Sequence, residues 1–280
     1  MISPSVRTAR DYNRTLWGPI RAAHVAWAAA RAAFGPVWEW AREPVRRSWA
    51  RPMVLGLPLL VVLWPLDGAI CAAARGWRLG GDVRRELEAA QQYGQLVSSL
   101  VAALAVFLLD RARRARLWDW ALAAVLAALA YHALKLFIGR PRPKFEDPAM
   151  ILGPFGTYPL TRDDGSVVLR HAWEFWRGIS SDLWSMPSSH TASAVVMSVM
   201  LARWYPALRP LVIALALGVA FARVALGAHY PTDVVAGAAV GWLAASWVQD
   251  GSRGRLLAVR LGWSRADPGE PGRNPGSGLN

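Results

Sequence analysis

The chain has 280 residues, of which 54% are hydrophobic and 18% are charged, and its formal net charge is +13. This apolar fraction and a mean hydropathy of +0.21 are high for a soluble globular domain and indicate an integral membrane protein. A nucleic-acid partner is not indicated, because the arginines flank long apolar runs and form no recognisable nucleic-acid-binding motif. The single cysteine, Cys71, excludes an intramolecular disulfide framework and most thiolate metal sites.

The N-terminal region carries basic residues and no compact apolar core, so no cleavable signal peptide is expected. Residues 1–52 contain nine arginines and five tryptophans, and the alanine-rich stretch 22–33 can be helical. Tryptophan with arginine suits an arm at the membrane interface. A partly ordered cytoplasmic arm is an equally good interpretation.

Six apolar stretches are predicted to be transmembrane helices, since a bilayer asks for about 20 residues per helix. They cover residues 53–74, 93–109, 117–138, 190–204, 208–226 and 231–248. The first should be kinked, because it contains Pro58, Pro65 and Asp67. A charged connector with a helix at 82–92 follows it. The predicted fold is therefore all-α, with a polytopic membrane domain at 53–248 and a disordered tail at 249–280.

One long polar segment, residues 139–189, lies between the third and fourth predicted spans. Its part 158–169 is typical of a small hairpin, with Asp164 and Gly165 at the turn. The aromatic residues that follow suggest a segment on the membrane surface, a lid or an entry lip for a substrate: Trp173, Phe175, Trp176 and Trp184.

An even number of spans places both termini on the same side of the membrane. That side would carry 20 of the 32 basic residues, with nine in the arm, four at 110–116, two at 203–209 and five in the tail. The positive-inside rule then predicts cytoplasmic termini and an extracytoplasmic long loop. A bacterial inner (plasma) membrane location is expected.

Three short polar patches fall on the outer side of this topology, because successive connections between spans alternate sides. They are residues 135–143 at the end of the third predicted span, 187–190 at the start of the fourth, and 223–233 between the fifth and sixth. The topology therefore predicts that the three patches meet on one membrane face.

These patches contain the groups that a phosphate site needs. Ser188 and Ser189 precede an apolar stretch and are residue types that cap helices. Free N–H groups at such a helix start, together with the helix dipole, favour an anion. Lys135, Arg142 and Arg223 add three cations, and the two guanidinium groups can bind phosphate oxygens in pairs. Arg223, near the end of an apolar span, would be costly without an anionic partner.

The same patches contain groups for proton transfer and nucleophilic attack. His229 and Asp233 are four residues apart across a predicted helix start, with Pro231 suited to the first helical position. This spacing can place the carboxylate against one imidazole nitrogen and leave the other free to attack phosphorus. His190 then supplies a proton to the leaving alkoxide. The set predicts metal-free phosphoryl transfer through a phosphohistidine.

Each feature also has a plainer interpretation. A lysine at a span end commonly snorkels, and a basic turn commonly meets lipid headgroups. His229 and Asp233 could be a helix-stabilising pair. With His190 they could instead ligate zinc, although three neighbouring cations disfavour a dication. The phosphoryl-transfer interpretation is preferred, because all the plainer ones would have to hold at once on one face.

The order and spacing of these residues resemble the type-2 phosphatidic-acid phosphatase and vanadium haloperoxidase superfamily. Its pattern is Lys-x6-Arg-Pro, then Pro-Ser-Gly-His, then Ser-Arg-x5-His-x3-Asp, and the resemblance covers about residues 53–248. The matching positions are Lys135 with Arg142 and Pro143, then Pro187 to His190, then Arg223 with His229 and Asp233.

The resemblance implies a nucleophile at His229, its orienting partner at Asp233 and an acid at His190. It implies a phosphate cradle made by the following residues: Lys135, Arg142, Ser188, Ser189 and Arg223. Two positions depart from the pattern, since Ser189 replaces a glycine and Ala222 replaces a serine. Neither departure removes a group that the chemistry needs, although either could change substrate preference or rate.

The function implied is that of a membrane lipid phosphatase without metal or cofactor. Expected substrates are phosphatidic acid, phosphatidylglycerol phosphate and undecaprenyl diphosphate, with their tails in the bilayer. A vanadate-dependent haloperoxidase is disfavoured, because members with that activity are soluble. A lipid phosphotransferase and a non-catalytic phospholipid-binding protein are the alternatives. The lipid bilayer and a membrane lipid are the expected partners, nucleic acid is not, and the oligomeric state is open.

Overall fold

The computed structural model describes residues 51–77, 79–161, 165–177 and 181–264. All of these belong to the unit Arg47–Asn280, since the chain divides after Arg46. The predictions for the N-terminal arm at 1–52 and for the tail beyond residue 264 therefore fall almost entirely outside the described residues.

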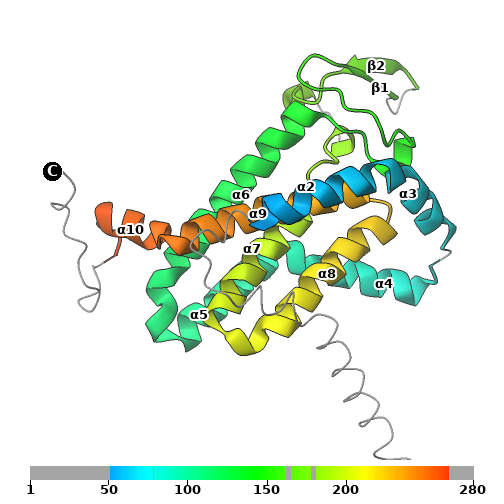
Figure 1. Cartoon of the computed structure of the whole chain (residues 1–280). Coiled ribbons are helices and arrows are strands. Elements are labelled where there is room, and N and C mark those ends of the chain that lie inside the picture. Colours follow the sequence, from blue (N-terminus) through cyan, green and yellow to red (C-terminus); the bar gives the residue numbers. More distant parts are fainter. Residues whose placement is uncertain (1–50, 78, 162–164, 178–180, 265–280) are drawn as a thin grey trace, which may run out of the picture. The chain divides into compact units, whose positions relative to one another are not determined.

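Every stretch predicted as an apolar span is helical (Figure 1). The helices are α2 (Arg51–Leu63), α3 (Asp67–Gly76), α5 (Leu96–Leu109), α6 (Leu117–Ile138), α7 (Ser189–Trp204), α8 (Arg209–Ala225) and α9 (Pro231–Asp250). The charged connector contains α4 (Gly81–Ala90), as predicted. Short 3-10 turns join several of these helices: η2 (Trp64–Leu66), η3 (Gln91–Gly94), η4 (Arg111–Arg116) and η8 (Pro206–Leu208).

The break between α2 and α3 is the predicted kink of the first span. Pro65 lies in the 3-10 turn η2, where its missing N–H and fixed φ interrupt the helical hydrogen bonds. Asp67 begins α3 directly after this turn and is fully buried. A carboxylate at such a position requires a charged partner.

Within the part of the chain that the structure describes, three helical stretches are long and apolar enough to cross a membrane: Leu55–Gly76, Arg111–Phe145 and Pro206–Ala225. A fourth is reached if Gly81–Gly94 and Leu96–Leu109, which bend by 58° at their junction, count as one span. By length and composition the chain is a multi-pass membrane protein. The predicted total of six spans stays a prediction.

Helices α7 and α9 are less apolar than α2, α5, α6 and α8, and much of their surface contacts protein. With α6 and α5 they form the largest buried cluster, in which Trp120 and Trp204 meet edge to face at 5.8 Å. Small residues at such interfaces allow close packing of helices in membranes. By contrast, α5 exposes a row of leucine and valine side chains at its surface, including Leu96, Leu100 and Leu104, which suits contact with lipid.

The segment between α6 and α7 contains the predicted hairpin, which lies at the C-terminal end of α6 (Figure 1). Strand β1 (Tyr158–Thr161) pairs antiparallel with β2 (Val167–Arg170), with Tyr158 opposite Arg170. Gly165 has φ 81°, as a tight turn requires, while Asp164 lies outside the described residues. Beneath the hairpin, the side chains of Tyr158, Ala172 and Leu183 form a small core.

The prediction of disorder directly after residue 249 is wrong for the first part of the tail. Helix α10 (Arg253–Arg260) packs on α6, and its first N–H groups are capped by a residue that is distant in sequence. The buried Asp119 carboxylate accepts hydrogen bonds from the N–H groups of Gly254 at 2.8 Å and Arg255 at 3.1 Å. This order depends on a contact with a residue more than 130 positions earlier, so local composition did not reveal it.

Candidate active site

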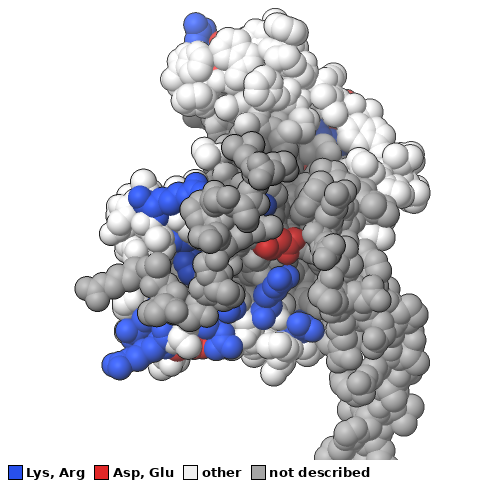
Figure 2. Space-filling view, turned by 60° about the vertical axis from the view of Figure 1, so that its left-hand side comes forward, with Lys and Arg blue, Asp and Glu red and all other residues white. Residues whose placement is uncertain are grey.

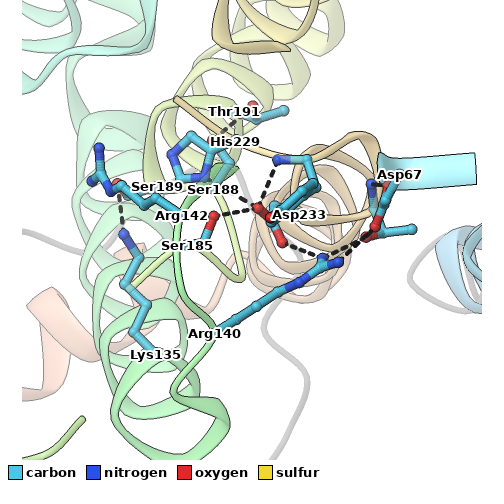
Figure 3. A network of polar contacts seen from close by, with 12 residues as sticks. Asp67, Lys135, Arg140, Arg142, Ser185, Ser188, Ser189, Thr191, His229 and Asp233 are labelled. Atoms are coloured by element: carbon cyan, nitrogen blue, oxygen red, sulfur yellow. Dashed lines mark hydrogen bonds and ion pairs between the residues drawn. The ribbon is translucent and has the colours of Figure 1, made fainter. Parts of the chain in front are cut away.

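The end of α6 and the start of α7 bring the first two polar patches together. Lys135, in the last turn of α6, is 6% exposed and donates to Ser189 Oγ at 3.3 Å. Arg142 follows the end of α6, and its Nε donates to the carbonyl of Ser181 at 2.9 Å. Figure 3 shows the cationic groups of Lys135 and Arg142 beside Ser188 and Ser189. These residues were predicted to share a site, and they do.

The start of α7 leaves backbone donors free for a ligand. Ser188 occupies the N-cap position, but its side chain caps no backbone N–H and accepts a hydrogen bond from Thr191 Oγ1 at 3.1 Å. The first N–H groups of a helix have no acceptor within the helix. The side-chain cap that the serine types suggested is therefore absent at Ser188, which leaves these donors available to an anion.

A turn after α8 connects the third patch to the other two. Gly227, at φ 68°, ends α8 in a Schellman motif, in which the N–H of Ala228 donates to Arg223 O at 3.0 Å and that of Gly227 to Val224 O at 2.9 Å. The N–H of His229 also donates to Arg223 O, at 3.1 Å. The five-residue spacing between Arg223 and His229 thus folds the histidine back onto the end of the helix.

His229 and Asp233 face each other across the start of α9. His229 is 1% exposed, and its Nδ1 lies 3.6 Å from Asp233 Oδ2. That distance is too long for a hydrogen bond, and Nδ1 has no hydrogen-bond partner among the described residues. Such contacts commonly shorten when a ligand binds. The geometry suits a carboxylate that stabilises the ring once it becomes positive.

Burial lowers the pKa of His229 to about 4, and the opposing effect of Asp233 is smaller. Desolvation disfavours the charged imidazolium when no partner compensates fully. The imidazole is therefore neutral at pH 7 and has one nitrogen with a free lone pair, which a nucleophile needs.

The carboxylate of Asp233 is held by a network that the sequence analysis missed (Figure 3). Its Oδ1 accepts from Arg140 Nη1 at 2.7 Å. Its Oδ2 accepts from Ser185 Oγ at 2.5 Å and from the N–H of Tyr230 at 2.8 Å. Asp233 therefore has a fixed position before any contact with His229 forms.

Arg140 links this carboxylate to the buried start of α3. Its guanidinium is fully buried, and Nη2 donates to Asp67 Oδ2 at 2.8 Å. The Arg140 Cζ atom lies 4.4 Å from the ring centre of Trp64 and 4.2 Å from that of Tyr230, so two aromatic faces also stabilise the cation. Two carboxylates share this one guanidinium, which leaves the group Asp67, Arg140 and Asp233 with a net negative charge.

A signal for this network was present in the sequence. Asp67 stood inside an apolar stretch, where a charge needs a partner, and Arg140 belonged to the first polar patch without a role. What the sequence did not reveal is that the two residues, 73 positions apart, are adjacent.

His190 and Arg223 are contacted by two glutamines that the sequence analysis also left out. Gln95 Nε2 lies 2.8 Å from His190 Nε2. Arg223 Nη1 donates to Gln91 Oε1, while its buried Nε has no partner among the described residues. The site thus combines His190, His229 and Asp233 with three cations, an open helix start and a buried guanidinium donor that is free for a ligand.

Comparison with known proteins identifies the family that this chain resembles. The sequence profile of the PAP2 superfamily matches residues 116–253, so the resemblance inferred from the motifs is confirmed. A lipid A 1-phosphatase from Rhizobium etli is 31% identical over 118 residues, which are 42% of this chain and 42% of that protein. The chain thus matches less than half the length of that relative.

Two solved structures resemble this chain. The transmembrane PAP2-type phosphatidylglycerolphosphate phosphatase from Bacillus subtilis aligns with a TM-score of 0.50 and 21% identity, covering 74% of this chain and 96% of that one. LpxE from Aquifex aeolicus aligns with a TM-score of 0.49 and 17% identity, covering 66% and 94%. At this identity the Bacillus structure supports the fold.

Proposed function

Since residues 116–253 match the PAP2 superfamily, we propose that this chain is an integral membrane phosphatase that hydrolyses a lipid phosphate monoester or diphosphate. One observation carries the proposal: a buried, neutral His229 lies beside a fixed Asp233 in a site that also holds His190 and three cations. A helix-stabilising pair would need neither the cations nor a second histidine.

The reaction proceeds in two displacements. The imidazole nitrogen of His229 that faces away from Asp233 attacks phosphorus, a P–N bond forms, and the P–O bond to the lipid breaks. His190, which takes up a proton when the anionic phosphate binds among the cations, gives that proton to the departing oxygen. The ring of His229 is now positive, and the contact with Asp233 stabilises it. Water then attacks phosphorus, with His190 accepting a proton, and the P–N bond breaks to release phosphate and restore His229.

The cations lower the barrier of both steps. Lys135, Arg142 and Arg223 surround the position of the phosphoryl group, and the N–H groups at the start of α7 face it from another side. Donors that are already in place where charge develops need no reorganisation during the reaction. Asp233 forms its ion pair with Arg140, so among the described residues it is not paired directly with any of these three cations.

An apolar groove beside the site supports a lipid as the substrate. It has a volume of about 350 Å³ and lies between α2, α3, α8 and α9. Val224 and Ala225, which directly follow Arg223, line it, as does Pro231, which lies between His229 and Asp233. We assign the groove to an acyl or isoprenyl chain of the substrate, because it begins next to the phosphate site and lies between apolar helices.

The distribution of charge supports an orientation in the membrane. In Figure 2, lysine and arginine gather on the lower part of the visible face, while the upper part is largely uncharged. Basic residues collect on the cytoplasmic side. With six spans, the termini and η4 are cytoplasmic, and the site and the hairpin are extracytoplasmic. The exposed aromatic side chains Phe155 and Trp176 would then lie at the outer interface, near the entry for lipid.

Phosphate release by the detergent-purified protein tests the proposal. The substrates are phosphatidic acid, phosphatidylglycerol phosphate, undecaprenyl diphosphate and a lipid A 1-phosphate, each in excess chelator with and without vanadate. We expect chelator-resistant, vanadate-sensitive release that is lost in His229→Ala, and the best lipid identifies the substrate class. Release that chelator abolishes would overturn the metal-free mechanism. Transfer of phosphate to an added alcohol in place of water would identify a phosphotransferase.

A further inference from the structure

The bend between α4 and α5 supplies two glutamine side chains to the site. It consists of η3 and of Gln95, the N-cap residue of α5. Gln95 contacts the ring of His190, and Gln91 accepts from the guanidinium of Arg223. Both glutamines precede residue 116, where the match to the PAP2 superfamily begins. Their roles therefore do not follow from the superfamily pattern.

Neighbouring residues hold this bend firmly against α7. A Cβ atom on Gly94 would lie 2.3 Å from the carbonyl oxygen of His190, so only glycine allows this approach. Tyr93 makes a hydrogen bond of 3.0 Å with Ser198 Oγ, two turns further along α7. The two residues that precede Gln95 thus fix its position beside His190.

The groups around His190 explain why an amide suits this position. The charged and titratable groups that act on the ring are Arg223 from α8, His229 from the following turn, Lys135 from α6 and Arg142 from the segment after α6. All of them are cations or can become cations. A carboxylate at residue 95 would neutralise this set, and an apolar side chain would leave a ring nitrogen without a partner.

We propose that Gln95 is a positioning residue for His190, which holds Nε2 and thereby leaves Nδ1 to exchange the proton with the leaving oxygen and with water. The proposal rests on the proposed phosphatase function. A primary amide has both a donor and an acceptor. Because Nδ1 exchanges the proton, Nε2 keeps its hydrogen in both the imidazolium and the neutral ring, and the amide, turned so that its oxygen faces Nε2, accepts from that N–H in both states. The ring therefore keeps its orientation in both protonation states.

Leaving-group dependence tests this role. Gln95→Leu is compared with Gln92→Leu, a matched control because the Gln92 side chain is exposed and, among the described residues, bonds only to Glu88 O. Two substrates are used: an alkyl lipid phosphate, whose leaving oxygen requires a proton, and 4-nitrophenyl phosphate, whose leaving group does not. We expect Gln95→Leu to lower kcat about 10- to 100-fold for the alkyl ester, within the range of general acid catalysis, and about threefold or less for the aryl ester.

An equal fall for both substrates would overturn the proposal, because it would show general damage to the site. No fall for either would overturn it as well. The control variant should match the wild type with both substrates.

A second measurement does not depend on activity. Ring ¹⁵N chemical shifts are recorded across pH for the chain, whose five histidines are assigned with a His190→Asn variant. We expect Gln95→Glu to raise the pKa of His190 and Gln95→Leu to change its tautomer, with no change in Gln92→Leu. Unchanged shifts in both Gln95 variants would overturn the contact. If the wild type releases no phosphate, the proposed function fails while this test of the contact still stands.

Discussion

Two buried cationic groups compete for the carboxylate of Asp233, one permanent and one transient. Arg140 is permanent and bonds to it at 2.7 Å. In the proposed mechanism, His229 becomes a cation when it carries the phosphoryl group. Asp67 pairs with the same guanidinium, so Arg140 compensates the negative charge of Asp233 only in part. The remaining charge can stabilise the phosphorylated ring. Asp67 can therefore act on the reaction without touching the substrate.

Changing Asp67 to Asn should reveal this effect. Arg140 would then compensate Asp233 more fully, and the positive charge on phosphorylated His229 would be less stabilised. We expect kcat to fall about tenfold, which corresponds to about 1.4 kcal/mol in the barrier. The free energy of unfolding should fall by about 3 kcal/mol, because one partner of a buried ion pair is lost. Steady-state kinetics and thermal unfolding in detergent measure the two effects.

The control for this variant is Asp82→Asn, since that carboxylate lies at the exposed start of α4 and its ion-pair partner within the described part of the chain is Arg85. It should leave kcat and stability unchanged. Wild-type kcat in Asp67→Asn would contradict the electrostatic role, and Asp67 would then serve stability alone.

The depressed pKa of His229 has a consequence for the dependence of activity on pH. A histidine acts as a nucleophile only when it is unprotonated, so activity is lost as pH falls through its pKa and is retained above it. With a pKa of about 4, kcat/KM should remain near its plateau at pH 5.5. An ordinary histidine, with a pKa of about 6.5, would be mostly protonated at that pH.

The measurement is kcat/KM for 4-nitrophenyl phosphate between pH 3.5 and 8, with helicity followed in parallel to exclude unfolding. The aryl ester is chosen because its leaving group needs no proton from His190. A loss of kcat/KM as pH falls through about 6.5 would show that the pKa of His229 is not lowered in the working enzyme.

Single residues were predictable here where their spacing matched a known chemical pattern. His190, His229, Asp233 and the three cations lie together as expected, because helix ends and tight turns translate short spacings into contacts. The sequence analysis did not predict a role in the site for Arg140, Asp67, Ser185 and the two glutamines. Their partners are distant in sequence, and a glutamine or serine alone carries no signal of function.

At the scale of elements, the groove between α3, α8 and α9 makes a prediction about lipid length. Ala220 lines this groove on α8, one turn before Arg223. An Ala220→Trp side chain would occupy space that the lipid chain needs. We expect KM for a long-chain lipid phosphate to rise at least about fivefold, which corresponds to about 1 kcal/mol, while the kinetics with 4-nitrophenyl phosphate stay within about twofold.

Ala214→Trp is the matched control, since Ala214 lies on the exposed surface of α8 and does not line the groove. Both variants add the same side chain to one helix. Equal effects of Ala220→Trp on the two substrates, or equal effects of the two variants, would contradict the assignment of the groove to the lipid chain.

The elements themselves followed closely from apolar patterning and proline positions. The predicted helix at 117–138 coincides with α6, and the kink near Pro65 is present. Two properties did not follow from local sequence. The order of α10 depends on Asp119 of α6, and the moderate hydropathy of α7 and α9 reflects their contact with other helices, which a count of apolar residues cannot distinguish from a soluble segment.

At the scale of the whole molecule, the arginine-rich turn η4 is separated from the candidate active site. Helix α6 has 22 residues and is about 33 Å long at a rise of about 1.5 Å per residue, close to the thickness of the hydrocarbon core, about 30 Å. The arginine-rich turn η4 precedes its start, and Lys135 lies in its last turn. The site and the basic turn are therefore at opposite ends of one helix. A phosphate released at the site would leave on the side opposite to η4.

The central claim is that phosphate passes through a covalent bond to His229, and direct trapping of that bond tests it. The protein is mixed with a ³²P-labelled lipid phosphate, quenched within milliseconds at alkaline pH and analysed for protein-bound label. We predict label that is stable in base and labile in acid, as a phosphoramidate is, located at residue 229 and absent from His229→Ala. Phosphate release at the wild-type rate without bound label, or label that persists in His229→Ala, would contradict the mechanism.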